Sequence, residues 1–262
     1  MGRRLIDISR PLQAGIASDP PHMLPRIDYI DHHASAPQIA EYFGIALDQL
    51  PDGEYAAIER VQISTHNGTH MDAPYHYFST MNHAILPGGE PSWRIDEVPL
   101  DWCYQRGVKL DFRHLPDGYV ATPQDVAAEL ARIGHTLRPL DIVLVNTAAG
   151  ARYGEADYID RGCGMGRAAT LYLLGQGVRL VGTDGWSWDA PFSHTRRRVR
   201  ETGDASLIWE GHRAGREIGY SHMEKLGNLE ALPPHGFEVA AFPVKVHRAS
   251  AGWTRAVAIL PD

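Results

Sequence analysis

Three histidines and an aspartate fall within eleven residues of this chain, between positions 66 and 76. The segment reads HNGTHMDAPYH, and its candidate ligands are His66, His70, Asp72 and His76. With 14 His in 262 residues, a window of this length would hold about 0.6 on average. Imidazole suits zinc, iron, copper and nickel, and carboxylate suits zinc and harder cations such as manganese. The cluster therefore predicts a site for a divalent metal.

The spacing of this cluster differs from that of a helical zinc-protease site. Such a site has two histidines four apart on a helix, with a glutamate after the first, whereas Asn67 follows His66 here. Gly68 weakens a helix, and Pro74 disfavours helical geometry at the residue before it. Residues 57–65 alternate imperfectly between apolar and polar side chains. This pattern predicts a strand that runs into a turn at the cluster.

Further ligands must come from distant parts of the chain. His212 and Glu224 stand twelve positions apart, but this spacing alone is weak evidence for a metal site. Four other histidines in the second half of the chain are equally available, namely His194, His222, His235 and His247.

The composition is that of an ordinary soluble globular protein. Hydrophobic residues make up 44% and charged residues 22% of the chain, and its length allows a substantial core. The net charge of −7 argues against nucleic acid as a partner. The first residues include no apolar stretch of the length expected in a signal peptide, no apolar run is long enough to span a membrane, and there are only two cysteines. We therefore expect a cytoplasmic protein without a nucleic-acid or membrane partner.

The hydrophobic pattern predicts an α/β chain with a mixed sheet. Residues 122–133 are expected to form a helix, because Thr122 can cap it and apolar residues follow at helical spacing. The near-continuous apolar run at 141–147 predicts a strand buried on both faces. A helix at 168–174 and a second strand at 178–184 would complete a βαβ unit.

The two ends of the chain give weaker patterns. Two strands are expected at 239–246 and 254–260, joined by a turn near 250–252. Residues 11–55 are expected to form an extended arm with a short helix near 37–43.

One basic run, Arg196-Arg197-Arg198 with Arg200, stands out from the acidic background. Such a run is typical of a solvated loop. The alternative is a lid that binds an anion.

The histidine cluster resembles the signature of the cyclase family of metal-dependent hydrolases, to which bacterial kynurenine formamidase and isatin hydrolase belong. The matching pattern is His66-x-Gly68-Thr69-His70-x-Asp72-x-Pro74-x-His76. Supporting matches span nearly the whole chain: Asp7-Ile8-Ser9 with Pro11-Leu12, Gly182-Thr183-Asp184, and Glu224-Lys225-Leu226-Gly227-Asn228-Leu229.

The resemblance implies a set of metal ligands. His66, His70 and Asp72 would bind a first divalent ion, and Asp72 would bridge to a second ion held by His212 and Glu224. The metal would be zinc or manganese. One or two ions are implied, because isatin hydrolases typically hold a single manganese.

The resemblance also implies a fold and an assembly. The expected architecture is a swivelling β/β/α fold with a mixed central sheet, in which residues 1–262 form a single domain with an extended N-terminal arm. A homodimer or homotetramer is implied, with N-terminal segments helping to build a neighbour's pocket. The chain is longer than the compact formamidases, and the excess at 13–55, 150–168 and 190–206 would form loops around the pocket.

The implied chemistry is hydrolysis of a small cyclic or aromatic amide, lactam or imide at a non-peptide C–N bond. A divalent ion lowers the pKa of bound water, to near 7 in the best cases. His76 would be the general acid/base that moves the proton to the leaving group. Four aromatic residues near the matched segments could stack on an aromatic substrate or be ordinary core or rim residues: Tyr75, Tyr77, Trp186 and Trp188.

Three alternatives remain. The same scaffold would serve an aryl formamidase or a lactone hydrolase. A non-catalytic metal-bound ligand-binding protein is a second alternative, although it would not need His76 as an acid/base. A structural zinc site is the third, but such sites usually use cysteine, and Cys103 and Cys163 lie far from the cluster in sequence.

Overall fold

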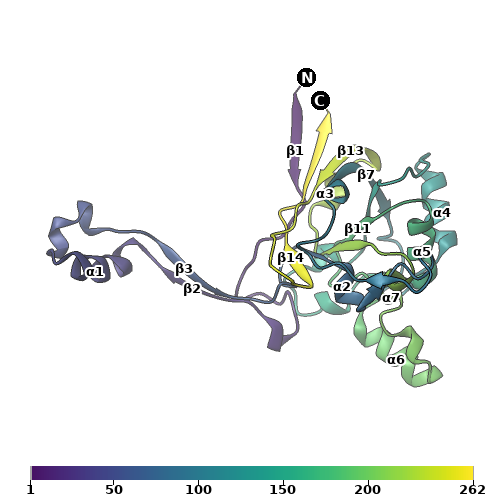
Figure 1. The fold of residues 1–262 in the computed structure, drawn as a ribbon, viewed down its shortest axis with the longest axis horizontal. Coiled ribbons are helices and arrows are strands. Elements are labelled where there is room, and N and C mark those ends of the chain that lie inside the picture. The colour runs from purple at the N-terminus through teal and green to yellow at the C-terminus, as the bar shows by residue number, and fades with distance from the viewer. Residues whose placement is uncertain (1, 262) are drawn as a thin grey trace.

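A nine-stranded mixed sheet organises the computed structural model of this chain, which describes residues 2–261 (Figure 1). Four central strands, β7, β9, β11 and β12, run parallel to one another, and the remaining neighbours pair antiparallel. In sheet order the strands are β1 (Arg3–Asp7), β15 (Val257–Pro261), β13 (His235–Ala240), β7 (Tyr104–Asp111), β9 (Ile142–Asn146), β11 (Leu180–Thr183), β12 (Ser221–Glu224), β4 (His70–Asp72) and β14 (Ala251–Trp253).

Helices and short strands surround this sheet. The helices outside the arm are α2 (Pro74–Tyr77), α3 (Leu100–Cys103), α4 (Pro123–Arg132), α5 (Arg167–Gly175), α6 (Phe192–Thr202) and α7 (Glu210–Glu217). Short strands pair as β5 (Thr80–Met81) with β6 (Glu90–Pro91) and as β8 (Val120–Ala121) with β10 (Gly164–Met165). Within residues 2–261, no helix is long and apolar enough to cross a membrane.

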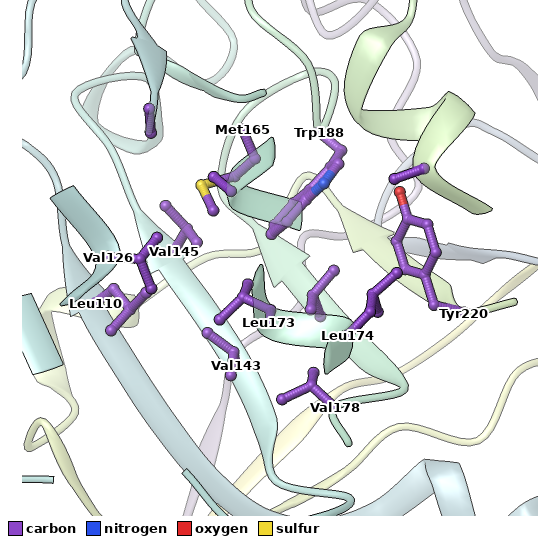
Figure 2. Packing of buried hydrophobic residues seen from close by; sticks show 14 of the residues in the cluster. Leu110, Val126, Val143, Val145, Met165, Leu173, Leu174, Val178, Trp188 and Tyr220 are labelled. Carbon is purple, nitrogen blue, oxygen red and sulfur yellow. The ribbon is translucent and has the colours of Figure 1, made fainter. Parts of the chain in front are cut away.

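The core lies on both faces of the sheet. Val143 and Val145 of β9 pack with Leu173 of α5 in one buried cluster (Figure 2). Ile142 and Leu144, which alternate with these valines, belong to a second cluster on the other face. Because both faces of β9 are covered, its sequence is a continuous apolar run instead of an alternating one.

The predicted βαβ unit and helix are confirmed. β9, α5 and β11 follow one another, and the two strands are parallel neighbours. α4 begins directly after Thr122, whose hydroxyl accepts a hydrogen bond from the Asp125 amide, while the Asp125 carboxylate accepts one from the Thr122 amide. This reciprocal capping satisfies two amides that a helix N-terminus otherwise leaves unpaired.

The C-terminal prediction was wrong for the first strand and for the turn, whereas the second expected strand is present as β15. β13 starts earlier than expected and ends at Ala240, and residues 241–250 form no strand. The predicted turn at 250–252 falls largely on a strand, because Ala251–Trp253 forms β14 and pairs with β4. This strand is stabilised by a partner far away in the sequence, which local sequence patterns do not reveal. The predicted loop at 190–206 was also wrong, since it contains α6.

The N-terminal arm extends away from the sheet (Figure 1). Its stem is a two-stranded antiparallel ribbon of β2 (Arg26–Ile30) and β3 (Ile58–Gln62), and α1 (His32–Phe43) lies at its far end. β3 is the strand expected at 57–65, but it belongs to the arm and not to the main sheet. The short helix expected near 37–43 is longer and begins after a capping Asp31, whose side chain accepts a hydrogen bond from the backbone of α1.

Candidate metal centre

Two neighbouring strands carry four polar side chains that meet at one place. β4 and β12 run antiparallel, and their register pairs Asp72 with His222 and His70 with Glu224. Residues directly opposite each other, and residues two apart along a strand, share a face of the sheet. All four side chains are buried there. We expected the cluster to lie where a strand ends in a turn. His70 and Asp72 instead belong to a strand of their own, β4.

His66 and His76 approach the carboxylate of Asp72 from the two segments that flank β4. The Nδ1 atom of His66 lies 2.9 Å from Oδ1 of Asp72. His76 lies on α2, which begins at Pro74, and its Nε2 atom is 3.8 Å from Oδ2 of Asp72. The centres of the two imidazole rings are 4.2 Å apart.

His212 reaches the same site from α7. Asp189 fixes its orientation. The carboxylate of Asp189 accepts hydrogen bonds from the backbone amides of Gly211 and His212, and it is also hydrogen-bonded to Nδ1 of the His212 ring. The opposite ring atom, Nε2, lies 3.9 Å from Oε1 of Glu224. A carboxylate behind a histidine is the usual support of a metal ligand, and we did not predict Asp189 from the sequence.

His70 directs one ring nitrogen toward the two carboxylates of the site. Its Nδ1 atom faces the Gly68 carbonyl at 3.0 Å, and a carbonyl can only accept, so in the neutral ring Nε2 presents a lone pair. That atom lies 3.2 Å from Oδ1 of Asp72 and 3.6 Å from Oε2 of Glu224. Nε2 of His70 and both carboxylate oxygens of Asp72 are buried without a hydrogen-bond partner among the described residues. Buried acceptors that face one another in this way fit a bound cation.

His222 is a further member of the site that the sequence analysis left among several alternatives. Its Nε2 atom lies 3.1 Å from Oδ2 of Asp72 and 3.1 Å from Oε1 of Glu224, and its Nδ1 atom lies 3.0 Å from the hydroxyl of Tyr77. His222 stands two residues before Glu224, so the period-2 rule for strands would have placed both side chains on one face.

The electrostatics keep both carboxylates ionised. Burial would raise the pKa of Glu224, but its hydrogen bond with His222 and nearby imidazoles lower that pKa to about 2. Burial also opposes ionisation of Asp72, yet the surrounding histidines hold its pKa well below the usual range. Burial lowers the pKa of His222, and the two carboxylates outweigh this and raise it to about 9. Ionised carboxylates are the form that binds metal.

The donor atoms form two overlapping sets. One set comprises Asp72, His212, His222 and Glu224, and the other comprises His66, Asp72 and His76; within each set one ligand atom per residue lies within 4.8 Å of the others. Asp72 belongs to both. All six residues expected at the site are therefore brought together, although His76, and not His70, joins His66 and Asp72 in the second set.

A cavity of about 220 Å³ adjoins these donors. Lys225, buried in its wall, pairs with the carboxylate of Asp19 and donates a hydrogen bond to the His66 carbonyl at 2.8 Å. The indole of Trp186 also donates to Asp19, at 3.0 Å. Asp19 and Met23, from the 13–55 segment, thus line the pocket, whereas most of the segment lies in the arm. Trp209 closes another side and stacks on His212, with ring centres 4.6 Å apart.

The four aromatic residues singled out in the sequence have different surroundings. Trp186 lines the cavity. Trp188 and Tyr77 are core residues, and the Trp188 amide donates a hydrogen bond to Glu224 at 2.9 Å. Tyr75 is 40% exposed and does not line the cavity. Trp209, which the sequence analysis missed, lines it instead.

Replacing Asp189 with Asn should weaken metal binding by about 10- to 100-fold, the usual effect of removing a carboxylate behind a ligating histidine. The amide keeps one acceptor for the backbone of α7 but loses the charge that orients His212. Competition with a chromogenic chelator would measure the affinity. Asp157→Asn, at an exposed ion pair with Arg152 and Arg161, is the matched control. Equal affinity in both variants would remove Asp189 from the site.

Comparison with known proteins gives one family and several similar folds. Residues 6–190 match the model of the family described as "Putative cyclase". An isatin hydrolase bound to the product analogue thioisatinate is 19% identical, with a TM-score of 0.75 over 99% of this chain and 93% of that chain. Isatin hydrolase A from Labrenzia aggregata, bound to benzyl benzoate, is 22% identical, with a TM-score of 0.73 over 99% and 94% of the two chains.

A potential metal-dependent hydrolase with cyclase activity is also similar. It is 19% identical, with a TM-score of 0.64 over the full length of both chains. At these identities the likeness establishes a shared fold, and it confirms the predicted α/β architecture with a mixed central sheet.

Proposed function

Since this chain belongs to the cyclase family, we propose that it is a metal-dependent hydrolase that opens a small cyclic or aromatic amide, lactam or imide. The observation that carries the proposal is the buried carboxylate of Asp72, which is shared by two sets of donors and lies within 4 Å of four imidazole rings. The similarity to isatin hydrolases supports it.

The proposed ligands divide around Asp72. His66 and His70 with Asp72 would hold one zinc or manganese ion, and His212 and Glu224 with Asp72 would hold a second. A divalent ion bound in this way lowers the pKa of a bound water and polarises a carbonyl group. Asp189 keeps the lone pair of His212 directed at the site.

His76 is the proposed general acid/base. Burial lowers its pKa to about 4, the positive charges of neighbouring imidazoles add to this, and Asp72 opposes it only in part. The ring is therefore neutral at pH 7 and can accept a proton from the attacking water. Its conjugate acid is strong for an imidazole, so it readily passes the proton to the leaving nitrogen. The substrate would receive this proton in the pocket that His76 and Trp209 line.

Metal analysis of the purified protein, combined with a hydrolysis screen, tests the proposed function. The screen would offer formanilides, isatin-like lactams, cyclic imides and lactones to the protein loaded with zinc or manganese. Turnover of lactams or imides supports the proposal. Turnover of formanilides or lactones alone would favour an aryl formamidase or a lactone hydrolase. Metal binding without turnover of any compound would favour a ligand-binding protein.

We also propose that the protein is a homodimer or homotetramer whose arms pack on neighbouring copies. α1 and its ribbon extend from the sheet with aromatic side chains in solvent, and Tyr42 and Phe43 are 79% and 65% exposed. Exposed apolar clusters of this kind mark interaction surfaces.

Replacing both Tyr42 and Phe43 with Asp should shift the molecular mass in solution toward the 29.0 kDa of one chain. Light scattering at micromolar concentration would measure the mass. Gln38→Asp, which adds a charge at an exposed position of the same helix, should leave it unchanged. A wild-type protein that is already monomeric would contradict the proposal.

A further inference from the structure

A second cavity opens beside the catalytic pocket. It lies along α6 and has a volume of about 610 Å³, compared with about 220 Å³ for the pocket at the donor cluster. Sites for small molecules usually enclose about 300–1,000 Å³. The inner pocket alone is below that range, so a substrate larger than a small cyclic amide would extend beyond it.

The two cavities share walls. Phe192 and Trp209 line both of them, and Asp189 reaches from the outer cavity to the ring of His212. Trp209 has a left-handed backbone, with φ of 57°, which is uncommon for a bulky residue and occurs mainly where surrounding structure enforces it. This conformation holds the indole stacked on His212 at the boundary. The outer cavity therefore adjoins the catalytic pocket at Phe192 and Trp209.

The walls of the outer cavity are largely apolar. One face of α6 contributes Phe192 and Val199, and Ile159 and Ile208 complete the apolar lining. Phe192 and Ile208 are 45% and 46% exposed, so they offer surface that a bound molecule would cover.

Two guanidinium groups stand on the same face of α6. Arg196 and Arg200 are one helical turn apart and both line the cavity. Neither forms an ion pair within the described part of the chain. Two carboxylates, Asp160 and Asp189, also line the cavity. Asp189 already accepts hydrogen bonds from the backbone of α7, so Asp160 is the carboxylate that remains to balance the two arginines. The outer part of the cavity thus has an excess of positive charge.

We propose that this cavity binds the distal part of the substrate, an aromatic or alkyl group that ends in a carboxylate held by Arg196 and Arg200. The proposal rests on the proposed hydrolase function and defines its substrate class. The reacting amide lies at the donor cluster, the apolar portion passes Trp209 and Phe192, and the anionic end meets the arginines on α6. The basic run of the sequence thus lies on a helix beside the pocket, and two of its arginines bind the anionic end of the substrate.

Two anilides that differ only at the far end test this assignment. The probes are 4-(4-formamidophenyl)butanoate and 4-butylformanilide, and their binding to the metal-loaded protein would be measured by quenching of tryptophan fluorescence. We expect the carboxylate to bind about tenfold more tightly, as one charge-assisted contact provides. Arg196→Gln combined with Arg200→Gln should bring the ratio of the two affinities close to one.

Arg197→Gln is the matched control, because Arg197 lies on the same helix, is exposed, contacts His194 and does not line the cavity. It should keep the tenfold ratio. A ratio near one in the wild type would overturn the proposal. A ratio that stays near ten in the double variant would also overturn it, because the carboxylate would then bind at the metal. A change of molecular mass in the double variant would also overturn it, since the cavity would then be an interface between copies. Because binding is measured without turnover, failure to hydrolyse either probe bears on the proposed function alone.

Discussion

Replacing Asp72 with Asn is expected to abolish turnover and to remove most of the bound metal. The carboxylate is buried, belongs to both sets of donors and lies within 4 Å of four histidines. Asn fills nearly the same volume, so packing is kept while the negative charge is lost. Metal ions supply several kcal/mol of transition-state stabilisation, which corresponds to a rate decrease of about a thousandfold or more.

The measurement is kcat together with metal content from elemental analysis, and circular dichroism would verify the fold. Asp101→Asn, at an exposed position of α3, serves as the control and should change neither quantity. An Asp72→Asn protein that keeps its metal and its rate would remove the shared carboxylate from the mechanism.

Replacing His76 with Ala is expected to lower kcat by about 10²- to 10⁴-fold, the range contributed by a positioned acid/base, with metal content near that of the wild type. His247→Ala, whose side chain is 84% exposed, is the control. Loss of metal from His76→Ala would instead identify His76 as a ligand, in keeping with its position in one set of donors beside His66 and Asp72.

The pH dependence of kcat gives His76 a second signature. Because its pKa is lowered to about 4, the ring is neutral above that pH and can act as a base, whereas below it the ring is already protonated. Turnover by the wild type should therefore fall as the pH drops through about 4, and His76→Ala should lack this decrease. Metal content must be measured at each pH, since protons also compete with metal for the ligating imidazoles.

The sequence was informative where function depends on local spacing. The pattern from His66 to His76 predicted residues that do lie together, and the cap at Thr122 and the apolar run at 141–147 predicted their elements correctly. These features depend on neighbours within a few residues, and such patterns are readable from one sequence.

The remaining features depend on contacts between distant segments. β14 forms only because β4 offers it an edge, and no alternation in residues 251–253 predicts this. Asp189 acts through α7, and its role is invisible until Gly211 and His212 are placed beside it. Trp209 lies in an irregular segment next to a basic helix that had the pattern of a solvated loop.

The register between β4 and β12 makes metal content a measure of correct folding. Asp72 faces His222, and His70 faces Glu224, only in one alignment of the two strands. If one strand shifted by one residue, both of its ligand side chains would turn to the opposite face of the sheet. Since β12 lies in the last quarter of the chain, a growing polypeptide cannot complete the site until nearly all of it has been synthesised. An ion that binds only the folded chain also stabilises it by mass action. The ratio of metal to protein in a preparation should therefore count the molecules that have reached the native alignment.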